Sequence, residues 1–166
     1  MSRFIFVSLL LLPLSGCFNG DDSKPEVPEV NTPPVAMDAQ LITQTEVAIN
    51  DSLEASDKES DMLSFALEQE AVNGTVTVMQ NGEFSYTPDI EYTGTDSFRF
   101  SVTDNQNPPV SGQVSITIEA LPVLFSNLSR NAFEQSFDAM PLRLNGRDVS
   151  NDVMDPAAYD DLLVDE

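Results

Sequence analysis

Apolar side chains recur at every second position between residues 35 and 120, and turn-forming residues interrupt this alternation at short intervals. A period of two directs successive side chains to opposite faces of a strand, so each run predicts a strand with one buried face. The pattern predicts about seven strands. They are expected at Val35 to Ile42; Val47 and Ile49; Leu63, Phe65 and Leu67; Val76 and Val78; Phe84 and Tyr86; Phe98, Phe100 and Val102; and Val114, Ile116 and Ile118.

These strands predict an all-β fold, a single Ig-like antiparallel β-sandwich over residues 35–120, because two sheets packed face to face bury such alternating side chains. Asn81-Gly82 separates two of the runs and predicts a type I′ hairpin, in which both residues adopt positive φ. Tyr92 is expected to cap the sandwich with a buried ring and a hydroxyl bonded to backbone. Asp96 is expected to cap the turn after Gly94.

The first 17 residues combine Arg3, an apolar run from Phe4 to Leu12, and small residues before Cys17, the only cysteine. The run is too short for a comfortable membrane span and is typical of a signal peptide. The pattern resembles a bacterial lipoprotein signal, which implies removal of residues 1–16 and acyl chains on Cys17 that anchor the protein to a membrane. An ordinary secretory signal with an incidental cysteine is the alternative. Phe18 stands where aspartate commonly marks inner-membrane retention in Gram-negative lipoproteins, so the outer membrane is favoured.

Residues 17–34 contain four prolines, several acidic residues and few apolar ones, which predicts an extended, semi-stiff linker. Residues 121–166 form an acidic extension that follows neither pattern. We expect a short amphipathic helix capped by Ser126 or Asn127, a small hairpin around Asn145-Gly146, and a last helical turn that begins at Asp155-Pro156. The apolar residues of the expected helix are Phe125, Leu128, Phe133, Phe137 and Met140, and those before the hairpin turn are Leu142 and Leu144. The extension either packs onto the sandwich or docks to a partner protein.

Six short motifs carry a more specific resemblance. Their order and spacing are similar to those of the bacterial cadherin-like, Ig-like repeat of exported adhesins and multidomain surface proteins. The resemblance covers roughly residues 31–120, and one copy is found, whereas the family usually has tandem copies. The motifs are Asn31–Ala36, Asp57–Leu63, Asn73–Val76, Gly82–Pro88, Tyr92–Phe98 and Val102–Asp104.

The resemblance implies a calcium site, since the family's acidic loop often binds calcium together with the aspartate that ends a later strand. The matching carboxylates are Asp57, Glu59, Asp61 and Asp104, and Asn31 offers a further carbonyl. Calcium takes six to eight oxygen ligands, and alternate positions of an extended loop point to one side. The alternative is a solvated acidic turn paired loosely with Lys58.

The chain carries 7 basic and 28 acidic side chains, and removal of Arg3 leaves 6 against 28, a net charge of −22. Such a charge disfavours binding to nucleic acid. The chain has no histidine, and no glycine-rich phosphate loop is found, so we expect no enzymatic activity. Two functions stay open. One is a membrane-anchored adhesion or recognition module with an envelope, surface-protein or glycan partner; the other is an accessory lipoprotein that holds a partner complex through the extension.

Overall fold

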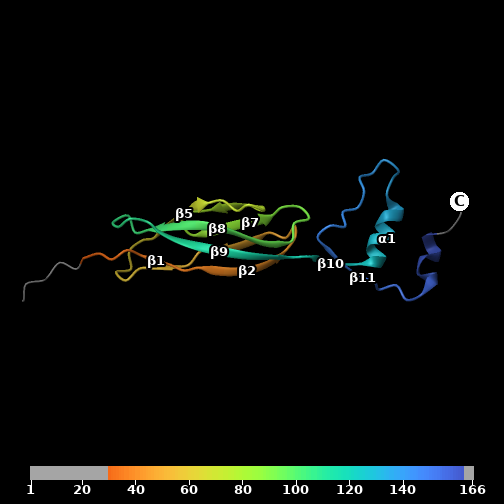
Figure 1. Cartoon of the computed structure of the whole chain (residues 1–166), viewed down its shortest axis with the longest axis horizontal. Coiled ribbons are helices and arrows are strands. Elements are labelled where there is room, and N and C mark those ends of the chain that lie inside the picture. Colours follow the sequence, from red (N-terminus) through yellow and green to blue (C-terminus); the bar gives the residue numbers. More distant parts are fainter. Residues whose placement is uncertain (1–29, 163–166) are drawn as a thin grey trace, which may run out of the picture. The chain divides into compact units, whose positions relative to one another are not determined.

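The computed structural model describes residues 30–162 (Figure 1). The predicted signal peptide, Cys17 and the linker up to residue 29 lie outside the described residues. Among the residues that are described, no helix is long and apolar enough to cross a membrane. The strands of the sandwich are β1 (Val35–Ala36), β2 (Ala39–Gln44), β3 (Ile49–Ser52), β4 (Ala55–Ser56), β5 (Ser64–Gln69), β6 (Gly74–Val78), β7 (Glu83–Pro88), β8 (Gly94–Thr103) and β9 (Val110–Glu119).

Two sheets form the layers of this sandwich, in agreement with the predicted all-β class. The larger sheet has the strand order β2-β9-β8-β5 and the smaller has the order β3-β7-β6, while β1 and β4 form a separate pair. One pair departs from the antiparallel prediction, because β2 runs parallel to β9. A parallel pair needs a long crossover connection, and the strands between β2 and β9 supply it.

Most of the core consists of alternating residues that the sequence pattern predicts, but not all of the predicted strand residues are buried: Val47 (43% exposed) precedes β3, and Ile42 (70% exposed) faces solvent from β2. Phe98, Phe100 and Val102 of β8 are at most 1% exposed, and Val114, Ile116 and Ile118 of β9 are at most 2% exposed. Tyr86 contributes a fully buried ring from the smaller sheet. The rings of Phe84 and Phe98 lie 5.3 Å apart between the layers. The two sheets therefore share one apolar interior.

The hairpin between β6 and β7 is confirmed, but its turn is not type I′. Gly82 has a φ of 90°, whereas Asn81 is not among the residues with positive φ. The Gly82 amide donates to the Met79 carbonyl at 2.9 Å, and the Asn81 side-chain oxygen accepts from the Glu83 amide at 3.1 Å. A turn followed by one left-handed glycine is the three-residue hairpin connection with a bulge. Asn81 therefore stabilises the turn through its side-chain hydrogen bond to the Glu83 amide, which requires no positive φ at Asn81.

Tyr92 behaves as predicted at its hydroxyl, which donates to the Thr95 carbonyl at 2.9 Å, but its ring is only partly buried against the core. The turn-cap prediction for Asp96 is wrong. Its carboxylate is buried and accepts from the amides of Val72 and Asn73 at 3.1 and 2.8 Å. The hydroxyl of Tyr86 also donates to Asp96 at 2.9 Å. Asp96 thus holds the β5–β6 turn against the core.

The extension contains β10 (Leu121–Leu124), α1 (Phe125–Glu134), β11 (Arg147–Ser150) and the 3₁₀ helix η1 (Pro156–Leu162). The hairpin predicted around Asn145-Gly146 is wrong, since β11 pairs parallel with β10 and α1 lies in the crossover between them. The prediction of Asp155 as a cap is confirmed by its side-chain bond to the Ala157 amide at 2.9 Å.

Neither predicted residue caps α1. The residue before the helix is Leu124, and the amide of Ser126 donates to the carboxylate of Asp152 at 2.9 Å. The helix ends at Glu134, so Phe137 and Met140 lie beyond it and are exposed. The carboxylate of Asp152 satisfies a helix amide that has no partner within the helix, and its place in the sequence gives no local sign of this.

Polar contacts join the extension to the turns of the sandwich. Arg147 forms an ion pair with Glu46 at 2.7 Å, and the side-chain amide of Asn145 donates to the carboxylate of Glu91 at 3.3 Å. The guanidinium of Arg147 lowers the pKa of Glu46. The core side chains described as buried and apolar all lie between Leu53 and Ile118, so the contacts of the extension add no large apolar residue to that core.

Candidate metal centre

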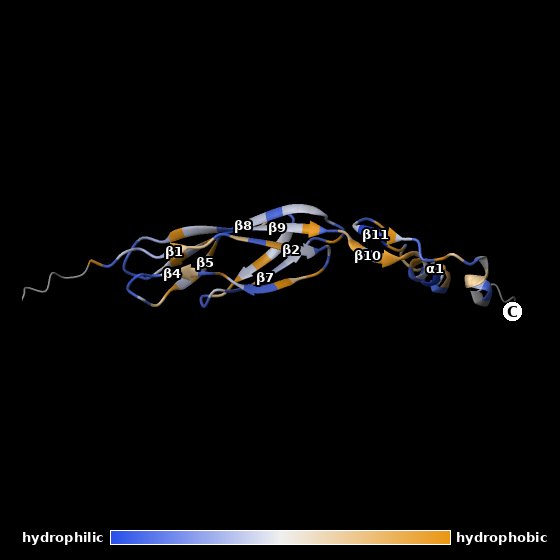
Figure 2. Ribbon diagram, turned by 90° about the horizontal axis from the view of Figure 1, so that it is seen from below, coloured by the Kyte–Doolittle hydropathy of each residue, from blue (hydrophilic) through white to orange (hydrophobic). Residues whose placement is uncertain are grey.

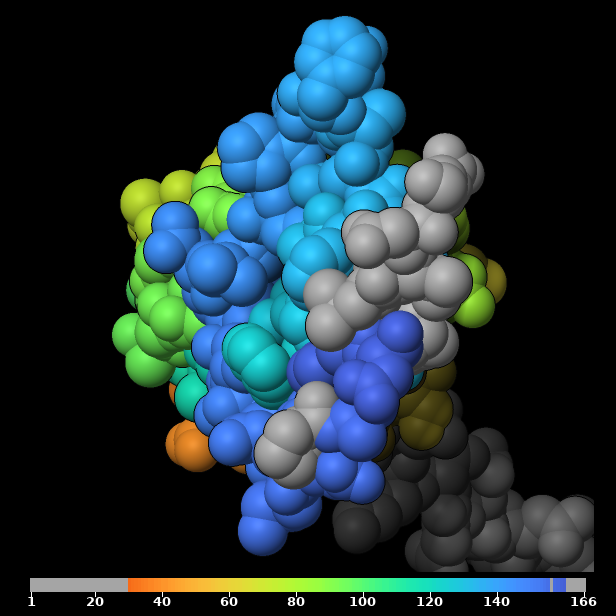
Figure 3. Space-filling view, turned by 90° about the vertical axis from the view of Figure 1, so that its right-hand side faces the viewer, coloured from red at the N-terminus to blue at the C-terminus, as the bar shows by residue number. Residues whose placement is uncertain are grey.

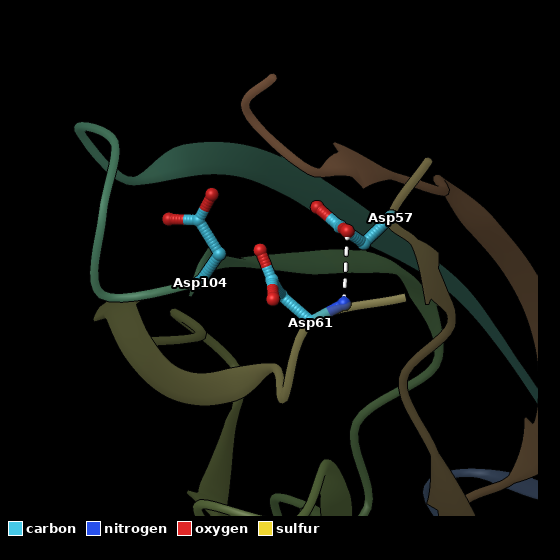
Figure 4. Close-up of side chains that lie close together, drawn as sticks. All are labelled: Asp57, Asp61 and Asp104. Carbon is cyan, nitrogen blue, oxygen red and sulfur yellow. Dashed lines mark hydrogen bonds between the residues drawn. The ribbon is translucent and has the colours of Figure 1, made fainter. Parts of the chain in front are cut away.

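Three of the four predicted carboxylate ligands meet at one place. Asp57 and Asp61 come from the loop between β4 and β5, and Asp104 follows the last residue of β8. Each offers one carboxylate oxygen that lies within 4.8 Å of the others, and Figure 4 shows the three side chains close together. The arrangement concentrates three negative charges in a volume suited to one cation.

A tight turn, not an extended loop, brings Asp57 and Asp61 together. Ser60 has a φ of 65°, an uncommon conformation for a residue with a side chain. Its amide lies 3.4 Å from the Asp57 carbonyl, and the Asp61 amide donates to Asp57 Oδ1 at 3.0 Å. The Asp61–Asp57 bond is the dashed line in Figure 4. The turn directs both carboxylates to the side where Asp104 lies.

Glu59 is not part of the cluster, which corrects the predicted ligand set. Its Oε2 accepts from the amide and the hydroxyl of Thr32 at 3.1 and 2.6 Å. Lys58 Nζ lies 3.3 Å from Glu59 Oε1. Hydrogen bonds from Thr32 are the main cause of the lowered pKa of Glu59. The prediction assumed that alternate residues point to one side, and the turn at Ser60 breaks that alternation.

Asp104 is held by donors on several sides. Asn31 Nδ2 and Asn107 Nδ2 donate to its Oδ2 at 2.8 and 2.9 Å. The amides of Gln106 and Asn107 donate to its Oδ1 at 2.9 and 2.8 Å. Asp104 is only 5% exposed, and these hydrogen bonds, those from Asn107 foremost, hold its pKa well below the usual range. Asp104 therefore stays ionised and fixed in position.

Asn31 has a supporting role. The sequence predicted that its carbonyl would be a ligand, but its side-chain amide binds the carboxylate of Asp104 and its main-chain oxygen lies 3.5 Å from Asn107 Nδ2. The folded unit begins at Asn31, and Pro34 is buried. The last residues of the predicted linker, 31–34, thus belong to the domain.

The charged form of Asp61 is disfavoured, and one oxygen of Asp57 has no hydrogen-bond partner in the part of the chain that the structure describes. Desolvation, followed by the negative charges of Asp57, Asp104 and Glu59, raises the pKa of Asp61. Asp57 Oδ2 is buried and has no hydrogen-bond partner among the described residues. A buried acceptor without a donor costs free energy, and a cation would satisfy it. The site presents three carboxylates, and carboxylate oxygens are ligands that calcium prefers.

The sequence reasoning missed the amides that hold the site. Gln106 Nε2 donates to Asp61 Oδ2 at 2.9 Å, which links the two parts of the cluster. Asn107 holds Asp104 in position, and a hydrogen bond from Thr32 holds Glu59 away from the cluster. The available signal was the run Asp104-Asn105-Gln106-Asn107, because amide residues directly after an acidic strand end are suited to bind its carboxylate.

Comparison with known proteins places the sandwich among cadherin-like domains. The family described as the bacterial cadherin-like domain matches residues 31–120. No curated protein matches the sequence. Human protocadherin-24 EC1-2 is similar in structure, with a TM-score of 0.43 and 17% identity, over 57% of this chain and 52% of that one. An endo-fucoidan hydrolase of glycoside hydrolase family 107 has a TM-score of 0.41 and 19% identity, over 55% of this chain and 14% of that one.

Proposed function

The chain belongs to the bacterial cadherin-like domain family, and from this we propose that it is a non-catalytic binding or adhesion module of the bacterial envelope, stabilised by calcium. The carboxylate cluster carries the calcium proposal. Asp57, Asp61 and Asp104 would hold the ion, and Gln106 and Asn107 would keep two of these carboxylates in place. The ion would offset their mutual repulsion and tie the β4–β5 loop to the end of β8.

Calorimetric titration with calcium tests this proposal. We expect one calcium site per chain. Asp57→Asn should lose calcium binding, because it replaces the carboxylate whose Oδ2 has no hydrogen-bond partner within residues 30–162. Glu70→Gln is the matched control, because it removes an exposed carboxylate outside the cluster. Equal heats for the parent and Asp57→Asn would show that the acidic loop is a solvated turn.

The anchor is proposed from the N-terminal pattern. Residues 1–16 would be removed, Cys17 would carry the acyl chains, and Phe18 after it favours the outer membrane. Mass spectrometry of detergent-extracted protein should find the lipid on Cys17, and Cys17→Ala should release the protein or block its processing. Labelling of intact cells would then separate a surface orientation from a periplasmic one. An unmodified Cys17 inside a soluble mature chain contradicts the anchor.

The non-catalytic assignment is supported by the chemistry of the chain. It has no histidine, and its single cysteine is the proposed lipid site. The clustered carboxylates are engaged by amides and lie close enough to repel each other, which suits a cation site. The partner of such a module would be an envelope protein, a surface protein or a glycan, bound without nucleic acid.

A second candidate function rests on the extension. Helix α1 contains no buried residue, although packing against other elements supplies most of the stability of protein helices. This favours an accessory lipoprotein that holds a partner protein through residues 121–162. Deletion of the extension would abolish partner retention in this case and would leave adhesion through the sandwich unchanged.

A further inference from the structure

Helix α1 is short and only partly covered within the described part of the chain, where Tyr159 of η1 contacts Ser129 and Arg130. It spans Phe125–Glu134, 10 residues, and none of them is buried. Isolated helices shorter than about 12–15 residues are marginal in water. Phe125 is 45% exposed and Phe133 is 62% exposed. The helix thus leaves large apolar side chains in contact with solvent.

An apolar groove runs along this helix. Phe125, Leu128 and Ala132 line one side, with the spacing of a single helix face, and Leu142, Leu144 and Val149 line the other. The groove has a volume of about 510 Å³. In the space-filling view of Figure 3, α1 and the segment that follows it adjoin at the surface. An apolar groove of this kind suits the apolar face of an amphipathic helix.

The small sheet beside the groove is also incomplete. It has two strands, β10 and β11, which run parallel. Parallel sheets occur almost only where both faces are covered, and Figure 2 shows β10 largely in the hydrophobic colour. Val149 of β11, which lines the groove, is 43% exposed. A partner in the groove would cover apolar surface from both the helix and the sheet.

The charged residues around the groove favour a partner of opposite charge. Glu134 ends α1, where the helix dipole is already negative, and no basic residue stands in the last turn. Asp138 follows nearby, and a hydrogen bond from Ser136 lowers its pKa, so it is ionised. Arg147 pairs with Glu46 and Arg130 donates to the Ala158 carbonyl at 2.7 Å, while Arg143 stands between the lining residues Leu142 and Leu144. The described extension, residues 121–162, contains seven acidic side chains and three arginines, so the surroundings of the groove carry a net negative charge.

We propose that the groove binds an amphipathic helix of a partner protein, with the apolar face of that helix in the groove and Lys or Arg side chains toward Glu134 and Asp138. The inference rests on the second candidate function. A second copy of this chain fits less well because it brings the same negative charges. An anionic lipid surface is repelled for the same reason.

The test uses the mature chain with Cys17→Ala, which carries no lipid, and a fluorescent Leu/Lys peptide of about 14 residues that forms an amphipathic helix. Two control peptides share its length: a Leu/Glu peptide of the same pattern and a scrambled Leu/Lys peptide. Anisotropy should show that the Leu/Lys helix binds about tenfold more tightly than either control. Phe125→Ser and Leu144→Ser should each weaken it by about tenfold, and Ile42→Ser, an exposed residue outside the groove, should have no effect.

Charge variants separate groove binding from general attraction to an acidic protein. Glu134→Gln with Asp138→Asn should weaken binding and reduce its salt dependence, while Glu70→Gln with Asp51→Asn should not. Equal binding of the Leu/Glu helix through the groove overturns the cationic partner but leaves a docking role. If Phe125→Ser and Leu144→Ser both leave peptide binding unchanged, the inference and the second candidate function are overturned together. Self-association, or binding to phosphatidylglycerol vesicles, that the groove variants abolish also overturns it.

Discussion

Gly112 provides a sharp test of the core. It pairs with Phe100 across β8 and β9, and a Cβ atom at position 112 would lie 2.4 Å from Phe100 Cζ and 3.1 Å from Ala36 Cβ. Favourable carbon contacts are about 3.5–4.0 Å, so the ring would have to move by about 1 Å. Phe100 is fully buried and lies 6.2 Å from the ring of Phe65, which leaves it little room to move.

Gly112→Ala should therefore destabilise the protein. Overpacking costs about 1–3 kcal/mol, and the lower entropy of alanine in the unfolded chain offsets about 0.4–1 kcal/mol of this. A net loss of about 1–2 kcal/mol corresponds to a melting temperature about 4–16 °C lower for a domain of this size. Circular dichroism melts measure this directly, with Ser111→Ala on the exposed face as the control.

The decisive measurement is a double-mutant cycle. Phe100→Leu alone should destabilise the protein, because it removes part of a buried ring. Combined with Gly112→Ala it should cost less than the sum of the single changes by about 1 kcal/mol, since leucine vacates the space that the new methyl group needs. Strict additivity, or a Gly112→Ala protein that melts with the parent, would refute the close contact and with it the assignment of this face of β8.

Three further outcomes follow from the site and the extension. Calcium at a hundred times its Kd should raise the free energy of unfolding by about 2.7 kcal/mol, about 10–20 °C in melting temperature, and magnesium at matched ionic strength should do much less. Without calcium at pH 7, Asp61→Asn should melt above the parent, because it removes a carboxylate whose pKa is raised by desolvation and by the neighbouring negative charges. The difference in melting temperature should close as the pH falls through that pKa, and calcium should reverse the order. Asp152→Ala should lower the helical signal in the far ultraviolet and Asp152→Asn should retain most of it, since the amide of Ser126 would keep an acceptor.

The core was predictable because its signal is local. Phe98, Phe100 and Val102 alternate within one strand, and all three are buried. A strand needs no knowledge of its partner to show which face is apolar. The parallel pairing of β2 with β9 was not predictable in this way, because alternation is the same for both directions of pairing.

Three members of the carboxylate cluster could be predicted from the sequence, and the position of Glu59 could not. Asp57, Asp61 and Asp104 meet because the β4–β5 loop and the end of β8 lie at the same end of the sandwich. The prediction for Glu59 is wrong because Ser60 adopts a left-handed conformation, of which the sequence gives no sign. A glycine at position 60 would have indicated such a turn, whereas a serine is equally compatible with an extended loop.

Polar partners distant in sequence escaped prediction for a common physical reason. Asp96 accepts from Tyr86 and from amides of the β5–β6 turn, and Asp152 accepts from Ser126 across the whole crossover. In each case a local role was available, a turn cap for Asp96 and a helix cap for Ser126, and the sequence favoured it. A buried or terminal amide must find an acceptor wherever the fold brings one. The acceptor's identity then depends on tertiary packing, which hydrophobic period does not encode. A chain with 28 acidic residues offers many equivalent acceptors for each donor, so here the choice among them could be made only from the structure.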